Sequence, residues 1–355
     1  MGEILVAGIT HYPPLAGRDE AMSWILKRML QNPQLPERLR TPSAWPAGMR
    51  EEWGLDEGTA SARHHRERLL KALRKTRAQI DAFHPDLIVI WGDDQYENFR
   101  EEIVPPYCIY AHDTFEFGPP AHNIWNEPAD KRFRLPGHVA AAKYLASGLI
   151  EAGFDTAYSY RPLHHPLGHA FANGILYLDY DRKGFAYPTI PFAINCYGRQ
   201  VIAQRGGLPN FENPPSEAQL DPPAPTPRRL FELGAATARI FSQSRWRVVL
   251  LASSGWSHAF LTAKNQYLFP DTLADREMYD ALRTGNYDLW RNYPAKAVEE
   301  SGQQELLNWM CIAGALAELR RAPKEMEFID TWIFNSSKCF LVAPPQANQD
   351  RITPS

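Results

Sequence analysis

Cysteine is scarce in this sequence, and its few cysteines lie far apart. The chain of 355 residues contains four, at Cys108, Cys196, Cys311 and Cys339, and it has no C-x-x-C pair. Zinc ribbons and disulfide frameworks need closely and regularly spaced cysteines, so neither is expected. The pattern predicts reduced thiols in a cytoplasmic protein.

The sequence also lacks a strong charge imbalance and a long apolar run. Lys and Arg number 38 against 41 Asp and Glu, which gives a net charge of -3 and a pI near 6.4. This balance offers no electrostatic attraction for nucleic acid or an anionic membrane. No run approaches the roughly 18 apolar residues that a membrane span needs, and residues 1–6 lack the features of a secretory signal. We therefore expect neither nucleic acid nor a membrane as a partner.

The signatures of several common enzyme classes are missing as well. The sequence has no G-x-G-x-x-G after a strand, no P-loop, no H-E-x-x-H and no G-x-S-x-G. Dinucleotide binding, P-loop nucleotide hydrolysis, zincin chemistry and an α/β-hydrolase nucleophile therefore find no support.

What the sequence does contain is a series of apolar runs that alternate with helical patterns. The runs predict buried strands at 3–9, 87–91, 189–195 and 248–252, with a final strand near 328–334. Helices are expected at 59–83, 138–152, 228–242, 275–284 and 303–319. This alternation predicts an α/β fold with a mixed, largely parallel central sheet flanked by helices.

The domain organisation is expected to be simple. A single catalytic domain is predicted over residues 1–345, followed by a tail at 346–355. Residues 18–80 read as a largely helical insertion with a proline-rich middle. Residues 205–227 are rich in Pro, Gly and Asn, which predicts a long irregular loop. A loop of that length is typically a functional lid or a disordered excursion.

Polar residues follow the predicted strands at the points where the strands end. His11, Asp93–Gln95, Asn195 and His258 come after the four strands in turn. Ligands of such sheets bind beyond the carboxyl ends of the strands. We therefore expect these segments, which are far apart in the sequence, to meet at one site.

Each candidate residue also has a simpler structural interpretation. His11 and His258 are either metal-binding or catalytic groups, or histidines that cap or fill the fold. Asp94, beside another carboxylate, requires a cation or serves as a helix cap. Glu305, in a helical segment with apolar neighbours, is either a ligand or a solvated flank. One histidine, one carboxylate and a further neutral ligand would suit Fe(II) in O2 chemistry.

A second group of histidines, His164, His165 and His169, falls within six residues. Histidines four apart can chelate a metal from a helix, but Pro166 and Gly168 would break that helix. We therefore predict a substrate-contacting loop here in preference to a chelating pair.

Six short motifs occur along the chain in an informative order. They are Gly8–Pro13, Pro85–Phe99, Gly137–His138, Ile190–Asn195, Ser254–His258 and Glu305–Trp309. Together they resemble the class III extradiol ring-cleaving dioxygenases, of the protocatechuate 4,5-dioxygenase β-subunit type. The resemblance implies that family's fold, a non-haem Fe(II) cofactor and extradiol cleavage of a catechol-type ring with O2.

The resemblance also implies a metal site, with one departure. The family binds iron through residues that correspond here to His11, Gln95 and Glu305, and two of these are histidines in the family. Gln95 replaces the second histidine, and an amide oxygen is a weaker ligand than imidazole. Asp94 or His112 would then supplement the site, another divalent metal would bind, or the chemistry would differ from that of the family.

The catalytic residues are implied in the same way. His258 corresponds to the family's acid/base histidine. The family's Asp-His-Gly motif has no clear counterpart, and His165 or His169 is the candidate for its histidine.

Four further residues are predicted to contact the aromatic substrate because of their positions near the motifs. They are Trp256, Asn195, Tyr197 and Arg199.

Three functions remain open from the sequence. The first is ring cleavage of a small aromatic substrate with O2. The second is a metal-dependent hydrolase or decarboxylase on the same fold, since fold does not determine chemistry. The third is a non-catalytic subunit. The sequence also leaves open a homo-oligomer or a small second subunit.

Overall fold

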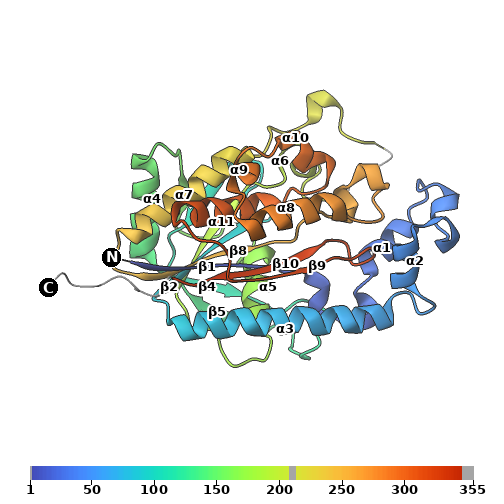
Figure 1. The fold of residues 1–355 in the computed structure, drawn as a ribbon, viewed down its shortest axis with the longest axis horizontal. Coiled ribbons are helices and arrows are strands. Elements are labelled where there is room, and N and C mark those ends of the chain that lie inside the picture. The colour runs from blue at the N-terminus through green and yellow to red at the C-terminus, as the bar shows by residue number, and fades with distance from the viewer. Residues whose placement is uncertain (1, 208–212, 346–355) are drawn as a thin grey trace.

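The computed structural model describes residues 2–207 and 213–345, and its centre is an eight-stranded sheet between two layers of helices (Figure 1). The strand order is β6-β3-β7-β2-β8-β1-β10-β9. These strands are β1 (Glu3–Ile9), β2 (Leu87–Asp93), β3 (Tyr107–Tyr110), β6 (Ala157–Ser159), β7 (Thr189–Ile194), β8 (Arg247–Ser253), β9 (Glu325–Ile329) and β10 (Lys338–Ala343). A separate two-stranded sheet pairs β4 (Thr114–Phe117) with β5 (Phe133–Pro136).

The centre of the large sheet is parallel. Strands β7, β2, β8 and β1 run in the same direction, while β3, β10 and β9 introduce the antiparallel pairings. All residues of β2 are buried, as expected for a parallel strand with helices on both faces. The α/β fold with a mixed, largely parallel sheet is therefore confirmed.

Alternate residues of β2 enter two separate core layers. Val89 and Trp91 pack with one layer, and Ile88 and Ile90 pack with the other, because side chains alternate across a strand. The first layer is covered by α4 (Val139–Glu151), α7 (Pro227–Ser242), α8 (Thr272–Thr284), α9 (Tyr287–Arg291) and α11 (Leu306–Glu318). The second is covered by α1 (Trp24–Leu30), α2 (Ala47–Trp53), α3 (Thr59–Phe83) and α5 (His169–Leu178). Two short helices, α6 (Gly198–Ala203) and α10 (Ala295–Glu300), complete the first side.

Helices α7 and α11 approach unusually closely, and two glycines permit it. A Cβ on Gly234 would lie 1.9 Å from the carbonyl oxygen of Cys311, and one on Gly314 would lie 1.8 Å from that of Phe231. Neither position could carry a side chain without moving a backbone. This contact fixes how α11 lies against α7, and Glu305 directly precedes α11.

Most predicted elements appear where the sequence placed them. Helix α3 has the predicted bounds, and the predicted helices after residues 138 and 228 match α4 and α7. The segment 18–80 is largely helical as expected. The division into one domain and a tail stays a prediction, and residues 208–212 of the predicted loop and 346–355 of the tail lie outside the described residues.

The C-terminal strands differ from the prediction. The strand expected over 328–334 ends at Ile329, and the next strand, Lys338–Ala343, was not predicted. Lys338 is fully buried at the start of β10. Hydrophobicity alone did not predict this strand because lysine is normally a charged surface residue. The short strands β3 to β6 and helix α5 were not predicted either.

The four cysteines are all buried and unpaired. In the described part of the chain, no helix combines the length and apolar character required to cross a bilayer.

Candidate active site

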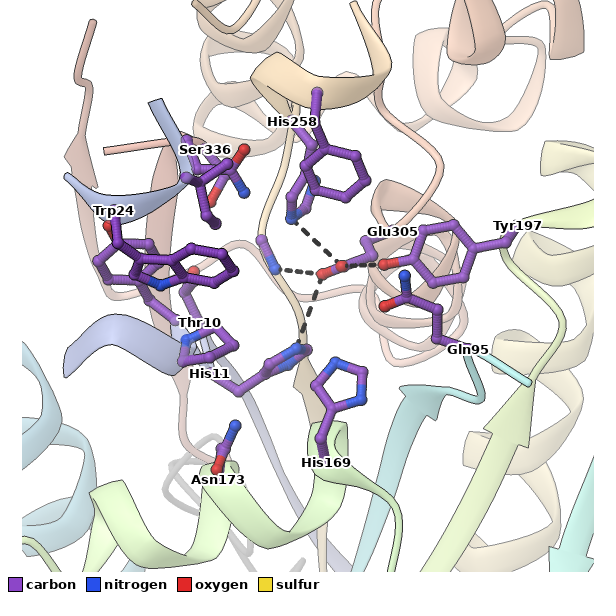
Figure 2. Close-up of a pocket in the computed structure, with 16 residues that line it drawn as sticks. Thr10, His11, Trp24, Gln95, His169, Asn173, Tyr197, His258, Glu305 and Ser336 are labelled. Carbon is purple, nitrogen blue, oxygen red and sulfur yellow. Dashed lines mark hydrogen bonds and ion pairs between the residues drawn. The ribbon is translucent and has the colours of Figure 1, made fainter. Parts of the chain in front are cut away.

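A cavity of about 330 Å³ opens where β1, β2 and β8 end (Figure 2). Its lining residues come from segments that are distant in the sequence: Thr10, His11, Tyr12, Pro13, Trp24, Ile25, Gln95, His169, Asn173, Tyr197, Gly255, His258, Phe260, Glu305, Asn335 and Ser336. The strand-end segments predicted to meet at one site do meet here, with the exception of Asn195.

His11 follows β1 and turns its ring into the cavity. Its Nδ1 donates a hydrogen bond of 2.8 Å to the carbonyl oxygen of Ser253. This leaves Nε2 free, 3.9 Å from Oε2 of Glu305. Burial lowers the pKa of His11 to about 4, so the ring is neutral, which is the form that binds metals.

His258 reaches the same carboxylate from the loop after β8. Its Nδ1 donates to the carbonyl oxygen of Trp256 at 2.7 Å, and its Nε2 lies 3.2 Å from Oε1 of Glu305. Burial lowers the pKa of His258 below its ordinary value. A Cβ on Gly255 would lie only 2.8 Å from Cε1 of His258, so glycine is needed for the ring to take this position.

Glu305 stands at the centre of these contacts, as Figure 2 shows. Its Oε2 accepts a 2.8 Å hydrogen bond from the backbone N–H of Gly255, and its Oε1 accepts one from the Tyr197 hydroxyl. Burial alone would raise the pKa of Glu305, but His258 and His11 lower it below the ordinary value. The Glu305 carboxylate is therefore ionised despite its burial.

His169 and Asp93 add two more donor groups beside His11. The His169 ring stands edge-on to the His11 ring, with centroids 5.0 Å apart, and its Nε2 lies 3.8 Å from Oδ2 of Asp93. One ligand atom from each of His11, Asp93 and His169 lies within 4.8 Å of the others. Both carboxylate oxygens of Asp93 are buried without a hydrogen-bond partner. A buried carboxylate without partners is costly, so this His/His/Asp group fits a divalent cation.

The comparisons with known proteins agree with this geometry. A family model described as the catalytic LigB subunit of aromatic ring-opening dioxygenase matches residues 218–336, which include His258 and Glu305. Over these residues, about a third of its length, the chain is similar to that family.

Parts of the chain are also similar to named dioxygenases. It is 29% identical over 195 residues to 2,3-dihydroxyphenylpropionate/2,3-dihydroxicinnamic acid 1,2-dioxygenase 2 of Pseudomonas putida, covering 54% of this chain and 49% of that protein. The similarly named enzyme of Paraburkholderia xenovorans is 30% identical over 184 residues, covering 51% and 46%. The matched segments thus span about half the length of the curated relatives.

Asp94 and Gln95, both predicted as metal ligands, occupy different environments. The Asp94 carboxylate accepts hydrogen bonds from the backbone N–H groups of Glu97, Asn98 and Phe99, at 2.9 to 3.3 Å. It therefore caps this turn and does not line the cavity, which is the structural alternative to ligation. Gln95 lines the cavity, and its amide N–H donates to the carbonyl oxygen of Gly206 at 2.7 Å.

Of the residues predicted to contact substrate, only Tyr197 lines the cavity. Trp256 is fully buried and packs against Trp309 and other aromatic rings, so its position beside a motif was misleading. The Asn195 side chain accepts from the Gly198 N–H, and Arg199 pairs with Glu217.

Of the two histidines considered for the Asp-His-Gly position, His169 lines the cavity and His165 does not. His165 is exposed on the preceding loop.

Several cavity residues had no signal in the sequence. Trp24 and Ile25 come from the helical insertion, and Asn335 and Ser336 come from the loop before β10. None of them belongs to a motif, so only the folded chain could reveal them.

Beneath the loop that carries His258 lies a buried carboxylate from α8. Asp275 is fully buried, accepts the backbone N–H of Ser257 at 3.1 Å, and accepts the amide N–H of Gln303 at 2.7 Å. Burial raises the pKa of Asp275 to about 7 from its ordinary 3.8. Since Ser257 and Gln303 adjoin the active-site loops, this carboxyl links their stability to pH.

The Asp275→Asn variant is expected to remove that link. Asp275 stabilises the fold fully below about pH 4, and this contribution is lost as pH rises through about 7. The unfolding free energy of the wild type minus that of the variant should therefore fall across this window, with a slope approaching roughly 1.4 kcal/mol per pH unit. Urea unfolding at a series of pH values measures it. Asp280→Asn, at an exposed site on the same helix, should give a flat difference, and a flat difference for Asp275→Asn would contradict the prediction.

Proposed function

We propose that this protein cleaves a catechol-type aromatic ring by Fe(II)-dependent extradiol oxygenation with O2. The observation that carries the proposal is the convergence of His11, His258 and Glu305 on one cavity, with the Nε2 atom of each imidazole turned toward the carboxylate. The similar proteins of Pseudomonas putida and Paraburkholderia xenovorans are named as 1,2-dioxygenases of 2,3-dihydroxyphenylpropionate, which supports the same chemistry.

His11 and Glu305 would hold the metal. A neutral imidazole and a carboxylate are the ligand types of non-haem Fe(II) sites that keep open positions for substrate and oxygen. Both side chains are buried and already oriented by hydrogen bonds from or to the backbone, as such ligands usually are. When bound, Fe(II) would bring the diol and O2 together and mediate electron transfer between them.

His258 would act as the general base and acid. Its Nδ1–H is bound to the Trp256 carbonyl oxygen, so Nε2 is the atom that can accept a proton. With its pKa lowered by burial, the ring is neutral near pH 7 and can take a proton from a substrate hydroxyl and later return it. The 3.2 Å distance between Nε2 of His258 and Oε1 of Glu305 supports a proton transfer beside the carboxylate that would hold the metal.

The remainder of the cavity suits a planar substrate. Trp24, Phe260 and Pro13 supply apolar surface, while Asn173 and Ser336 supply neutral polar groups. A volume of about 330 Å³ is at the lower end of the range for small-molecule sites, roughly 300–1,000 Å³. It accommodates a single substituted ring.

An oxygen-electrode assay tests the proposed function. The protein would be loaded anaerobically with Fe(II) and given catechol, protocatechuate or 2,3-dihydroxyphenylpropionate. We expect the uptake of one O2 per substrate consumed and the appearance of a yellow ring-opened product. Turnover without O2 would instead identify a hydrolase or decarboxylase, and no turnover with any catechol would contradict the proposal.

A further inference from the structure

The two metal ligands of the proposed function, His11 and Glu305, include only one imidazole. In the resemblance, the residue aligned with the family's second iron-binding histidine is Gln95. The Gln95 amide N–H is committed to the Gly206 carbonyl oxygen. A second imidazole, that of His169, nevertheless stands at the cavity wall beside His11.

We propose that His169, oriented by Glu97, is the second imidazole ligand of the metal, and that Asp93 completes the donor set beside it. His169 thus restores from helix α5 the ligand type that is missing at Gln95. The inference rests on the metal site of the proposed function, and it assigns that site a donor set of His11, His169, Asp93 and Glu305.

The hydrogen bonds of His169 are those of a metal-binding histidine. Its Nδ1 lies 3.0 Å from Oε2 of Glu97, and its backbone N–H donates to the same carboxylate at 3.0 Å. Histidine ligands commonly donate one ring N–H to a carboxylate, which fixes the tautomer and makes the other nitrogen more basic. The free Nε2 of His169 is the atom that faces Asp93.

Glu97 is itself held in place by two interlocked loops. The Asp94 carboxylate caps the turn that contains Glu97. The Asn98 side chain accepts the backbone N–H groups of residues 163–165 and donates to the carbonyl oxygen of Pro166. The loop before His169 is therefore tied to the loop after β2 before any ligand binds, and Glu97 is a positioning residue for His169.

Asp93 provides an independent indication of a cation. It is fully buried at the end of β2, and neither carboxylate oxygen has a hydrogen-bond partner in the structure. In the metal-bound site Asp93 and Glu305 would supply two negative charges, and the two histidines would bind as neutral rings. A divalent cation would balance these charges where burial makes an unbalanced carboxylate costly.

Cobalt binding tests this assignment without using activity. Co(II) would be titrated anaerobically into metal-free protein, with affinity and stoichiometry measured by equilibrium dialysis. The proton NMR spectrum of the Co(II) protein in H2O should contain two strongly shifted, solvent-exchangeable imidazole N–H signals, from His11 and His169. His169→Ala should weaken binding by roughly 100-fold or more and leave one such signal.

Matched variants separate ligation from a structural role. Glu97→Gln, which keeps the His169 ring, should weaken binding by roughly 10–100-fold and move one N–H signal. His165→Ala, in the exposed part of the same loop, and Gln95→Ala should each change the affinity by less than about threefold. If His169→Ala does not fold, Glu97→Gln carries the test through the same two readouts.

Two results would overturn the assignment. One is a His169→Ala protein that keeps wild-type Co(II) affinity and both N–H signals. The other is a larger loss from Gln95→Ala than from His169→Ala, which would return the ligand position to Gln95. If Co(II) binds with two imidazole N–H signals but no catechol causes oxygen uptake, the proposed function is refuted and this inference is not. Oxygen uptake with unchanged Co(II) affinity in His169→Ala would refute this inference alone.

Discussion

Replacing His258 by glutamine is expected to lower kcat by roughly 10²–10⁴-fold, while each chain still binds one metal ion. The imidazole lies 3.2 Å from Glu305, yet in the proposed mechanism it transfers protons and does not ligate. Glutamine keeps a hydrogen-bonding side chain but cannot exchange a proton near neutral pH. Steady-state oxygen uptake and metal analysis of the same preparation measure the two effects together.

The matched control for this variant is His64→Gln. His64 is an exposed histidine on α3 and does not line the cavity, so the substitution should leave both kcat and metal content unchanged. If His258→Gln loses its metal in parallel with its activity, then His258 is a ligand and its assignment as the acid/base group is wrong.

Replacing Glu305 by glutamine is expected to weaken metal binding by roughly 100-fold or more, which corresponds to about 2.7 kcal/mol. Glutamine has nearly the same shape and can still accept the Gly255 N–H, so the fold should persist. What it removes is the ionised carboxylate on which His11, His258 and Tyr197 converge. Oxygen uptake should be lost along with the metal.

Thermal unfolding with and without added metal provides the measurement. A ligand that binds only the native state stabilises it by an amount that grows with the logarithm of its affinity, so metal should raise the unfolding midpoint of the wild type more than that of the variant. Glu318→Gln, at the half-buried C-terminal end of α11 in an ion pair with Arg239, should respond to metal as the wild type does. An equal response of Glu305→Gln and the wild type would exclude Glu305 as a ligand.

The fold was predictable in outline because buried segments are apolar in the sequence. The run 87–91 is apolar at each position, and in the structure it forms a strand covered on both faces. The bounds of helix α3 were predicted correctly from the local sequence pattern alone. Strand β10 was not found because its first residue, Lys338, is a charged group that the fold buries.

The candidate site was predictable to a lesser extent. The strand-end rule identified the neighbourhoods of His11 and His258, and Figure 2 shows that they face the same carboxylate. The rule could not distinguish neighbours at one strand end. The Asp94 side chain caps a backbone turn, while the Asp93 side chain is buried without a hydrogen-bond partner.

By itself, the sequence determined the α/β architecture, the family resemblance and the segments that supply the central donors, because these follow from local hydrophobic patterns and short motifs. Only the tertiary structure decided which side chains point into the cavity. Trp256 entered the aromatic core, and His169 was directed inward by a carboxylate 72 residues away. The direction of a side chain depends on hydrogen bonds and packing between distant segments, and those contacts exist only once the chain has folded.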